Sequence, residues 1–210
     1  MKLGVILGTT RTPCNTAGIE AYVSTVLAAE FPHIEVERIN LATSPGHPLS
    51  LDIPMVPALL TIDVVPDAYV DEKTKAWSKT VLSWDGILVI TPQYNASVPA
   101  PLKNAFDQLY SELNNMPIGL ISVGYGGGPE LQATFKRMMA VLKAKVCEKG
   151  VMVPLGQEVY YEKAYAKGDE EWITKHKDAV VALVKELEEN AKEFSAIKAD
   201  RGQKTVAPPA

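Results

Sequence analysis

Short apolar runs alternate along this chain with longer stretches of helical periodicity. Four of the runs are rich in Val, Ile and Leu and end near a glycine, proline or polar cluster, as buried strands do. A fifth run, over residues 34–40, is more mixed and is also interpreted as a strand. We predict strands over residues 2–7, 34–40, 86–91, 118–123 and 151–155.

The segments between the strands carry apolar residues three or four positions apart, the spacing of one helix face. After the first strand, for example, Ile19, Val23 and Leu27 recur at this spacing. The pattern predicts helices over residues 19–30, 70–84, 102–113, 131–146 and 169–194.

Strands that alternate with helices require crossover connections and a parallel sheet covered on both faces. We therefore expect a flavodoxin-like three-layer α/β/α sandwich whose five-stranded parallel sheet has the order 2-1-3-4-5. This domain spans residues 1–197, and the polar residues 198–210, with Pro208 and Pro209, are predicted to form a disordered tail.

Residues 41–67 interrupt the alternation. Their five prolines exclude a continuous helix or a central strand: Pro45, Pro48, Pro54, Pro57 and Pro66. A short helical turn around residues 58–62 is the regular structure expected there. A loop of this length in a compact domain is usually functional or packed on a neighbour.

Composition narrows the class of protein. The net charge of -4 argues against a nucleic-acid binder, which normally presents a basic face. No apolar run approaches the roughly 18 residues of a membrane span, and the start of the chain does not resemble a signal peptide. Cys14 and Cys147 form no disulfide framework. We expect a cytoplasmic protein that does not bind membranes.

Three unusual loops follow the first, third and fourth strands, at residues 8–16, 91–97 and 124–128. Ligands of open parallel sheets bind at the carboxyl ends of the strands, where the strand order reverses. In the expected order these three strands are neighbours. We therefore expect the three loops to line one crevice.

The first loop is rich in hydroxyls and precedes a helix, whose N-terminus favours an anion. Thr9, Asn15 and Thr16 can donate to phosphate oxygens, and Arg11 adds charge. An ordinary helix cap with a surface arginine is an equally good interpretation of this loop alone. The motif of a P-loop is missing, and so are the glycines of a dinucleotide fingerprint.

The other two loops suit a planar ligand. Pro92, Tyr94 and Asn95 join exposed backbone with an aromatic ring that can pack on a heterocycle. Residues 124–128 contain four glycines, which let the backbone approach a ligand closely. Taken singly, each loop is also compatible with a simple turn; together they indicate a binding site.

Residues 92–107, with the sequence PQYNASVPAPLKNAFD, are similar to the segment PEYNxSxPGxLKNAxD of the NADPH-dependent FMN reductase family. That family includes bacterial and fungal quinone, azo-dye and chromate reductases. The resemblance covers residues 1–157. It departs from the family at Gln93, at Ala100 and at residues 129–131, where a glutamate, a glycine and an arginine are usual.

The resemblance implies which residues bind FMN. The first loop would contact the phosphate, the second would line the flavin ring, and the glycine turn would lie under the isoalloxazine. The implied residues are Thr9, Arg11, Asn15, Thr16, Pro92, Gln93, Tyr94, Asn95, Gly124, Tyr125, Gly126 and Gly127.

The resemblance also implies an activity: hydride transfer from NADPH or NADH, through FMN, to a quinone-type or other small acceptor, by a ping-pong mechanism. Because the flavin carries the hydride, no catalytic side chain is expected. The three histidines lack the spacing of metal ligands, so no metal is expected. A homodimer is expected, through residues 102–113 and 41–67. A flavodoxin-like electron carrier and a flavin-dependent regulatory protein are the alternatives.

Overall fold

A computed structural model describes residues 1–52 and 54–206 of the chain. Its centre is a six-stranded parallel sheet with the order β2-β1-β3-β4-β5, in which β6 also pairs with β4. The order 2-1-3-4-5 is thus confirmed, with the fifth position shared by two short strands. The strands are β1 (Lys2–Leu7), β2 (Glu35–Asn40), β3 (Gly86–Pro92), β4 (Pro117–Gly124), β5 (Lys145–Val146) and β6 (Val151–Pro154).

Successive side chains of the central strands point to opposite faces of the sheet, as strand geometry requires. In β3, Ile87 and Val89 belong to one core cluster, and Leu88 and Ile90 belong to the other. All four are fully buried. This two-sided burial explains why β3 reads as a continuous apolar run.

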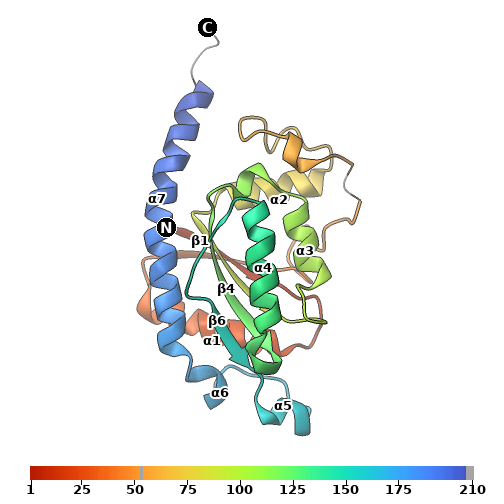
Figure 1. Ribbon diagram of the computed structural model, residues 1–210, viewed down its shortest axis with the longest axis vertical. Helices are drawn as coiled ribbons and strands as arrows, with labels where there is room; N and C mark the ends of the chain where they lie inside the picture. Colours follow the sequence, from red (N-terminus) through yellow and green to blue (C-terminus); the bar gives the residue numbers. More distant parts are fainter. Residues whose placement is uncertain (53, 207–210) are drawn as a thin grey trace.

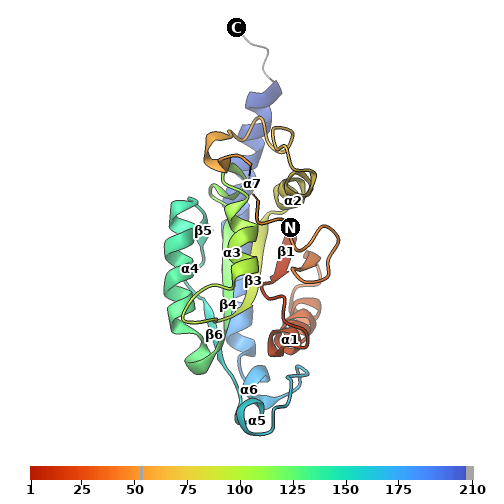
Figure 2. The same cartoon turned by 90° about the vertical axis from the view of Figure 1, so that its right-hand side faces the viewer.

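Helices cover both faces of the sheet. One face packs against α1 (Asn15–Glu30) and α7 (Lys177–Val206), and the other against α2 (Glu72–Leu82), α3 (Ala100–Asp107) and α4 (Pro129–Val141). Figure 1 shows α7 on one side of the sheet and α3 and α4 on the other. Figure 2 shows the same layers after a rotation of 90° about the vertical axis. The predicted three-layer sandwich is confirmed. Two short helices, α5 (Gln157–Tyr161) and α6 (Glu171–Thr174), lie between β6 and α7.

Helix α3 is shorter than predicted and is followed by a separate 3₁₀ turn at Ser111–Leu113. The backbone leaves the helical region at Tyr110, where φ is -148°. The Tyr110 N–H donates to the Glu112 carboxylate at 3.1 Å. The Glu112 side chain therefore replaces a helix carbonyl as the acceptor of this N–H. Such competition between side chain and backbone cannot be predicted from the periodicity of the sequence.

The proline-rich segment 41–67 is ordered against the α3 face. Among its described residues, helical structure is found in the 3₁₀ turn Pro57–Leu59, close to the turn predicted at 58–62. Gln108 donates to the Ser50 carbonyl at 2.6 Å, and Asn104 donates to the same carbonyl at 3.1 Å. Side chains at the end of α3 thus satisfy a backbone carbonyl of an otherwise irregular segment.

The C-terminal region differs from the prediction in two ways. The single helix predicted over 169–194 is divided into α6 and α7, and α7 continues to Val206. Residues 198–206 are therefore helical rather than a disordered tail, while residues 207–210 lie outside the described residues. The Lys198 ammonium bonds Asp85 at 3.0 Å and the Trp84 carbonyl at 3.1 Å, which fixes α7 beyond residue 197. In the described part of the chain, no helix combines the length and apolarity needed to cross a membrane.

Candidate functional site

The register of the sheet brings the three sequence-predicted loops together. Leu7 of β1 pairs with Ile90 of β3, and Pro92 of β3 pairs with Val123 of β4. Backbone hydrogen bonds extend this register past the strands: Gly8 N–H donates to the Ile90 carbonyl at 2.9 Å, and Gln93 N–H donates to the Val123 carbonyl at 2.7 Å. The loops therefore start side by side at the carboxyl edge of the sheet, as predicted.

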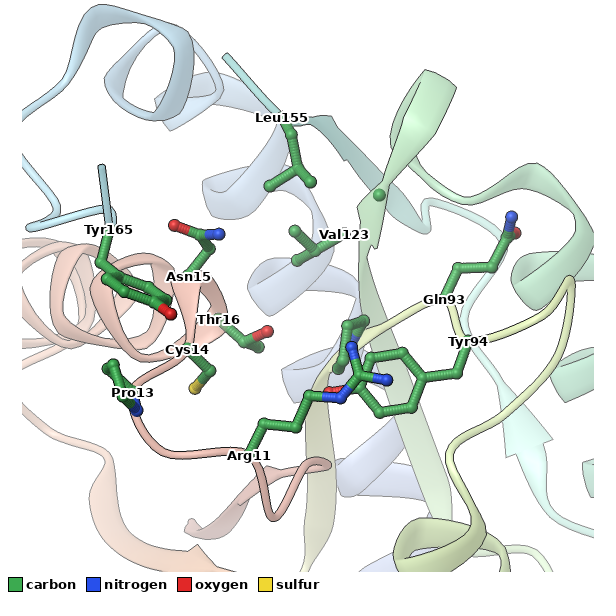
Figure 3. Close-up of a pocket in the computed structure, with 12 residues that line it drawn as sticks. Arg11, Pro13, Cys14, Asn15, Thr16, Gln93, Tyr94, Val123, Leu155 and Tyr165 are labelled. Atoms are coloured by element: carbon green, nitrogen blue, oxygen red, sulfur yellow. The ribbon is translucent and has the colours of Figure 1, made fainter. Parts of the chain in front are cut away.

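A cavity of about 280 Å³ opens at this edge (Figure 3). Seven of the predicted ligand-binding residues line it: Arg11, Asn15, Thr16, Pro92, Gln93, Tyr94 and Gly124. Five other residues complete the lining: Pro13, Cys14, Val123, Leu155 and Tyr165. Within the described residues, no carboxylate is part of this lining, so the cavity suits an anion.

The N-terminus of α1 forms one end of the cavity. Cys14 is the N-cap residue, with extended backbone, and its side chain makes no capping hydrogen bond. The first N–H groups of a helix have no intrahelical acceptor, and the first turn of α1 holds no acidic residue. The buried Thr16 lies at the same end. A helix terminus with these groups can bind an anion.

Tyr94 links the first loop to the second. Its hydroxyl lies 2.6 Å from the Thr9 Oγ1 atom, and Thr9 is buried beneath the cavity. The Thr9 Oγ1 atom also accepts the Arg11 N–H at 3.2 Å. The Arg11 guanidinium lies 3.8 Å from the centroid of the Tyr94 ring, a cation–π contact. Figure 3 shows Arg11 reaching across the cavity mouth toward Tyr94.

The backbone after Tyr94 turns sharply. Tyr94 and Ser97 exchange two backbone hydrogen bonds, of 3.1 and 2.9 Å. The two residues between them, Asn95 and Ala96, have φ of 48° and 60°, which is the pattern of a type I′ turn. Both are exposed at the tip of the turn, outside the cavity lining. Asn95 was predicted to bind the ligand. In the structure it adopts the left-handed backbone conformation that this turn requires, which asparagine tolerates better than most residues.

Gln93 joins the second loop to the third. Gln93 is one of the lining residues, and its side-chain oxygen accepts the Leu131 N–H at 2.9 Å and so caps the first turn of α4. Figure 3 shows this side chain directed away from the cavity. A carboxylate oxygen can accept the same bond, so the replacement of the family's glutamate by glutamine preserves the contact.

The glycine turn begins at Gly124, which lines the cavity, and continues through three residues with positive φ: Gly126, Gly127 and Gly128. A side chain at Gly127 would place its Cβ 2.6 Å from Met152, so the turn requires glycine there. Tyr125 is 85% exposed. Of the predicted third-loop residues, Tyr125, Gly126 and Gly127 therefore lie outside the lining.

The lining residues that sequence reasoning missed fall into two kinds. Val123 and Leu155 lie at the carboxyl ends of the last strands, so the rule that located the three loops also applies to them. Pro13 and Cys14 lie within the first loop, but nothing in their type marked them as ligands. Tyr165 comes from the segment between α5 and α6, and no motif in the sequence places it near α1.

The histidines and Cys147 lie elsewhere. Cys147 directly follows β5, where it is buried. Burial raises the pKa of its thiol to about 12. His47 packs edge-on against Trp77, with ring centroids 5.1 Å apart, and burial lowers its pKa. Neither residue lines the cavity.

The cavity has two chemically different ends. The α1 end offers N–H groups and the Thr16 hydroxyl, and the Arg11 guanidinium lies over the Tyr94 ring. The other end offers the Tyr94 ring, Pro92 and the Gly124 backbone, with Val123 and Leu155 as apolar walls. A ligand with a phosphate at one end and a planar ring system at the other, as in FMN, fits this arrangement.

Two comparisons by sequence agree with this chemistry. The sequence model of the NADPH-dependent FMN reductase family matches residues 1–158. An NAD(P)H-dependent FMN reductase of Schizosaccharomyces pombe is 36% identical over 146 residues, which cover 69% of this chain and 68% of that protein. A quinone reductase of Escherichia coli is 32% identical over 114 residues, which cover 49% of this chain and 60% of that protein.

Comparison of structures confirms the fold. FerB of Paracoccus denitrificans, a flavoenzyme NAD(P)H:(acceptor) oxidoreductase, superposes with a TM-score of 0.63 at 20% identity. The superposition covers 90% of this chain and 98% of that one. At this identity the likeness concerns the fold alone.

Proposed function

Because this chain belongs to the family of NADPH-dependent FMN reductases, we propose that it transfers a hydride from NADPH or NADH, through bound FMN, to a quinone-type acceptor. The observation that carries the proposal is the two-ended cavity. An anion-binding helix terminus and an aromatic and glycine-lined end meet in one cavity at the carboxyl edge of the sheet. The activities named for the yeast and bacterial relatives support it.

FMN, when bound, supplies an acceptor and donor of hydride, which is the chemistry that no side chain of the cavity provides. The chain binds and orients it. The α1 N-terminus and Thr16 would hold the phosphate, and Arg11 would add a positive charge. Tyr94 and the Gly124 backbone would orient the ring, and the apolar side chains of Val123 and Leu155 would exclude water beside it.

The same opening serves both reactants in this proposal. Nicotinamide and quinone are both planar, and Gly124, the glycine that lines the cavity, has no side chain to divide the approach to the ring. NAD(P)⁺ therefore leaves before the acceptor enters, which is a ping-pong sequence.

Steady-state kinetics tests this function. Pure protein with FMN should oxidise NADPH in the presence of a quinone, and initial rates at several fixed quinone concentrations should give parallel double-reciprocal lines. Intersecting lines would show that both reactants bind at once and would contradict the shared opening. An absence of NADPH oxidation would instead favour an electron carrier.

We also propose that the chain forms a homodimer. The segment 41–67 exposes large apolar side chains, with Leu51 at 81%, Val56 at 59% and Leu59 at 79% exposed. Clustered exposure of this kind is typical of an interaction surface. Ile53, another apolar residue of this segment, lies outside the described residues. Met55 and Leu60 are partly buried against the chain's own core.

A cytoplasmic location is part of the same proposal. Cys14 and Cys147 are both free thiols, which suits a reducing compartment. NADPH and FMN are small cytosolic metabolites, so the hydride donor and the cofactor would both be available there.

A further inference from the structure

Residues 162–168, which connect α5 to α6, run across the first turns of α1; we call them the strap. The strap lies beyond residues 1–158, the part of the chain that matches the family model. One of its side chains, Tyr165, lines the cavity. The strap therefore adds a component to the site that the three loops do not supply.

Two contacts fix the strap on α1. The Ala166 N–H donates to the Asn15 Oδ1 atom at 2.8 Å. At Gly18, an added Cβ would lie 2.2 Å from the Ala166 carbonyl oxygen, so only a glycine in α1 lets the strap lie this close. The predicted phosphate ligand Asn15 thus uses its side-chain oxygen to hold the strap.

The far end of the strap is held by a carboxylate. Glu170 accepts the Lys167 N–H at 2.7 Å and the Gly168 N–H at 2.8 Å. On the other side of Tyr165, the Ala164 N–H donates to the Glu158 carbonyl at 3.4 Å, so residues both before and after Tyr165 are held by hydrogen bonds. This ordering reduces the conformational entropy that Tyr165 loses when it contacts a ligand.

Tyr165 lies at the α1 end of the cavity, beside Asn15 and across from Tyr94, with its hydroxyl directed into the cavity (Figure 3). Its side chain is partly open to solvent, since the residue is 52% exposed. The groups around it at this end are the α1 N-terminus and Thr16, and no carboxylate among the described lining residues competes for the phenol hydrogen.

We propose that Tyr165 is a phosphate ligand of the cofactor, with its phenolic hydroxyl donating to a phosphate oxygen while the strap covers the α1 end of the site. The inference rests on the proposed function, because it takes the anion to be the FMN phosphate. The Tyr165 hydroxyl is an uncharged donor. It suits this position because the N-terminus of α1 already stabilises the negative charge of the phosphate. The strap then slows release of the cofactor without touching its ring.

Titration of the apoprotein with FMN and, separately, with riboflavin tests this assignment, because the two ligands differ only in the phosphate. The Tyr165→Phe variant should raise the Kd for FMN about tenfold or more, the ratio expected for loss of one hydrogen bond to a charged group. Its Kd for riboflavin should equal that of the unmodified chain. Tyr161→Phe is the matched control, because Tyr161 is 82% exposed and lies outside the lining.

The outcomes separate the inference from the proposed function. If the unmodified chain binds neither ligand, the proposed function fails. If it binds FMN but Tyr165→Phe behaves like Tyr161→Phe, or if Tyr165→Phe weakens FMN and riboflavin equally, the phosphate contact is wrong.

A second variant tests the strap itself. Gly18→Ala should displace the strap and weaken FMN by a similar factor, while adding little to the effect of Tyr165→Phe in the double variant, because both remove the same contact. Full additivity of the two changes would overturn the proposed role of the strap. Alanine is a good helix residue, so α1 itself should persist, which circular dichroism can verify.

Discussion

The hydroxyl groups of Thr9 and Tyr94 lie 2.6 Å apart, although the two residues are 85 positions apart in sequence. Thr9 is buried at the end of β1, and Tyr94 follows β3. The bond fixes the Tyr94 ring against the first loop, where Arg11 stacks on it. The phosphate end and the ring end of the cavity are therefore coupled before any ligand binds.

A double-mutant cycle tests this coupling. Tyr94→Phe and Thr9→Val each remove one hydroxyl and should each lower the free energy of unfolding by about 1 kcal/mol, the typical value for one hydrogen bond. The double variant should lose less than the sum, because the residues act on one bond. Urea unfolding measures all three, and strictly additive losses would show that the two hydroxyls do not interact.

Arg11 should contribute to ligand affinity and little to stability. It is exposed, and its recorded side-chain contact is with the Tyr94 ring. Arg11→Ala should weaken FMN by about 1.5–3 kcal/mol, the range for a hydrogen bond to a charged group, with an almost unchanged urea midpoint. Arg137→Ala removes the same charge from an exposed position of α4 and serves as the control. Equal FMN affinities in the two variants would remove Arg11 from the site.

The two cysteines should differ sharply in reactivity. Burial raises the pKa of Cys147 to about 12, so this thiol stays protonated and unreactive at neutral and mildly alkaline pH. Cys14 lines the cavity. Iodoacetamide followed by mass spectrometry should find Cys14 modified first, and FMN should protect it. Modification of Cys147 at a comparable rate in the folded protein would contradict its burial.

The proposed dimer depends on the apolar side chains of segment 41–67. Leu59→Lys places a charge on a side chain that is 79% exposed, so the fold of one subunit should persist while association weakens. Light scattering should report a dimer for the unmodified chain and a monomer for this variant. Val141→Lys, on α4 at a residue that is 71% exposed, should remain a dimer. A monomeric unmodified chain at micromolar concentration would end this proposal.

The sequence predicted the position of the site better than the direction of its side chains. The strand pattern placed the loops after β1, β3 and β4 at one edge, because strands that alternate with helices run parallel and end at the same edge of the sheet. Whether Asn95 points into the cavity depends instead on a turn with two positive φ values. A turn was one interpretation of this loop, but its type could not be predicted, since Ala96 is unusual at such a position.

Contacts between distant segments were the hardest to predict. Tyr165 reaches the cavity only because Gly18 and Asn15 accept the strap, a tertiary contact across about 150 residues. The end of α3 depends on Glu112, whose carboxylate takes the Tyr110 N–H. Periodicity describes the faces of elements, but such side-chain to backbone bonds are decided by the packed structure.

The most direct test of the account is the response of the reconstituted protein to NADPH without oxygen. Apoprotein is mixed with FMN, unbound flavin is removed, and the absorbance of the yellow flavin is followed in a stopped-flow instrument. We predict that the flavin stays with the protein, that NADPH bleaches it, and that a quinone then restores the colour. Protein that retains FMN while NADPH leaves its absorbance unchanged would contradict the proposed reductase activity.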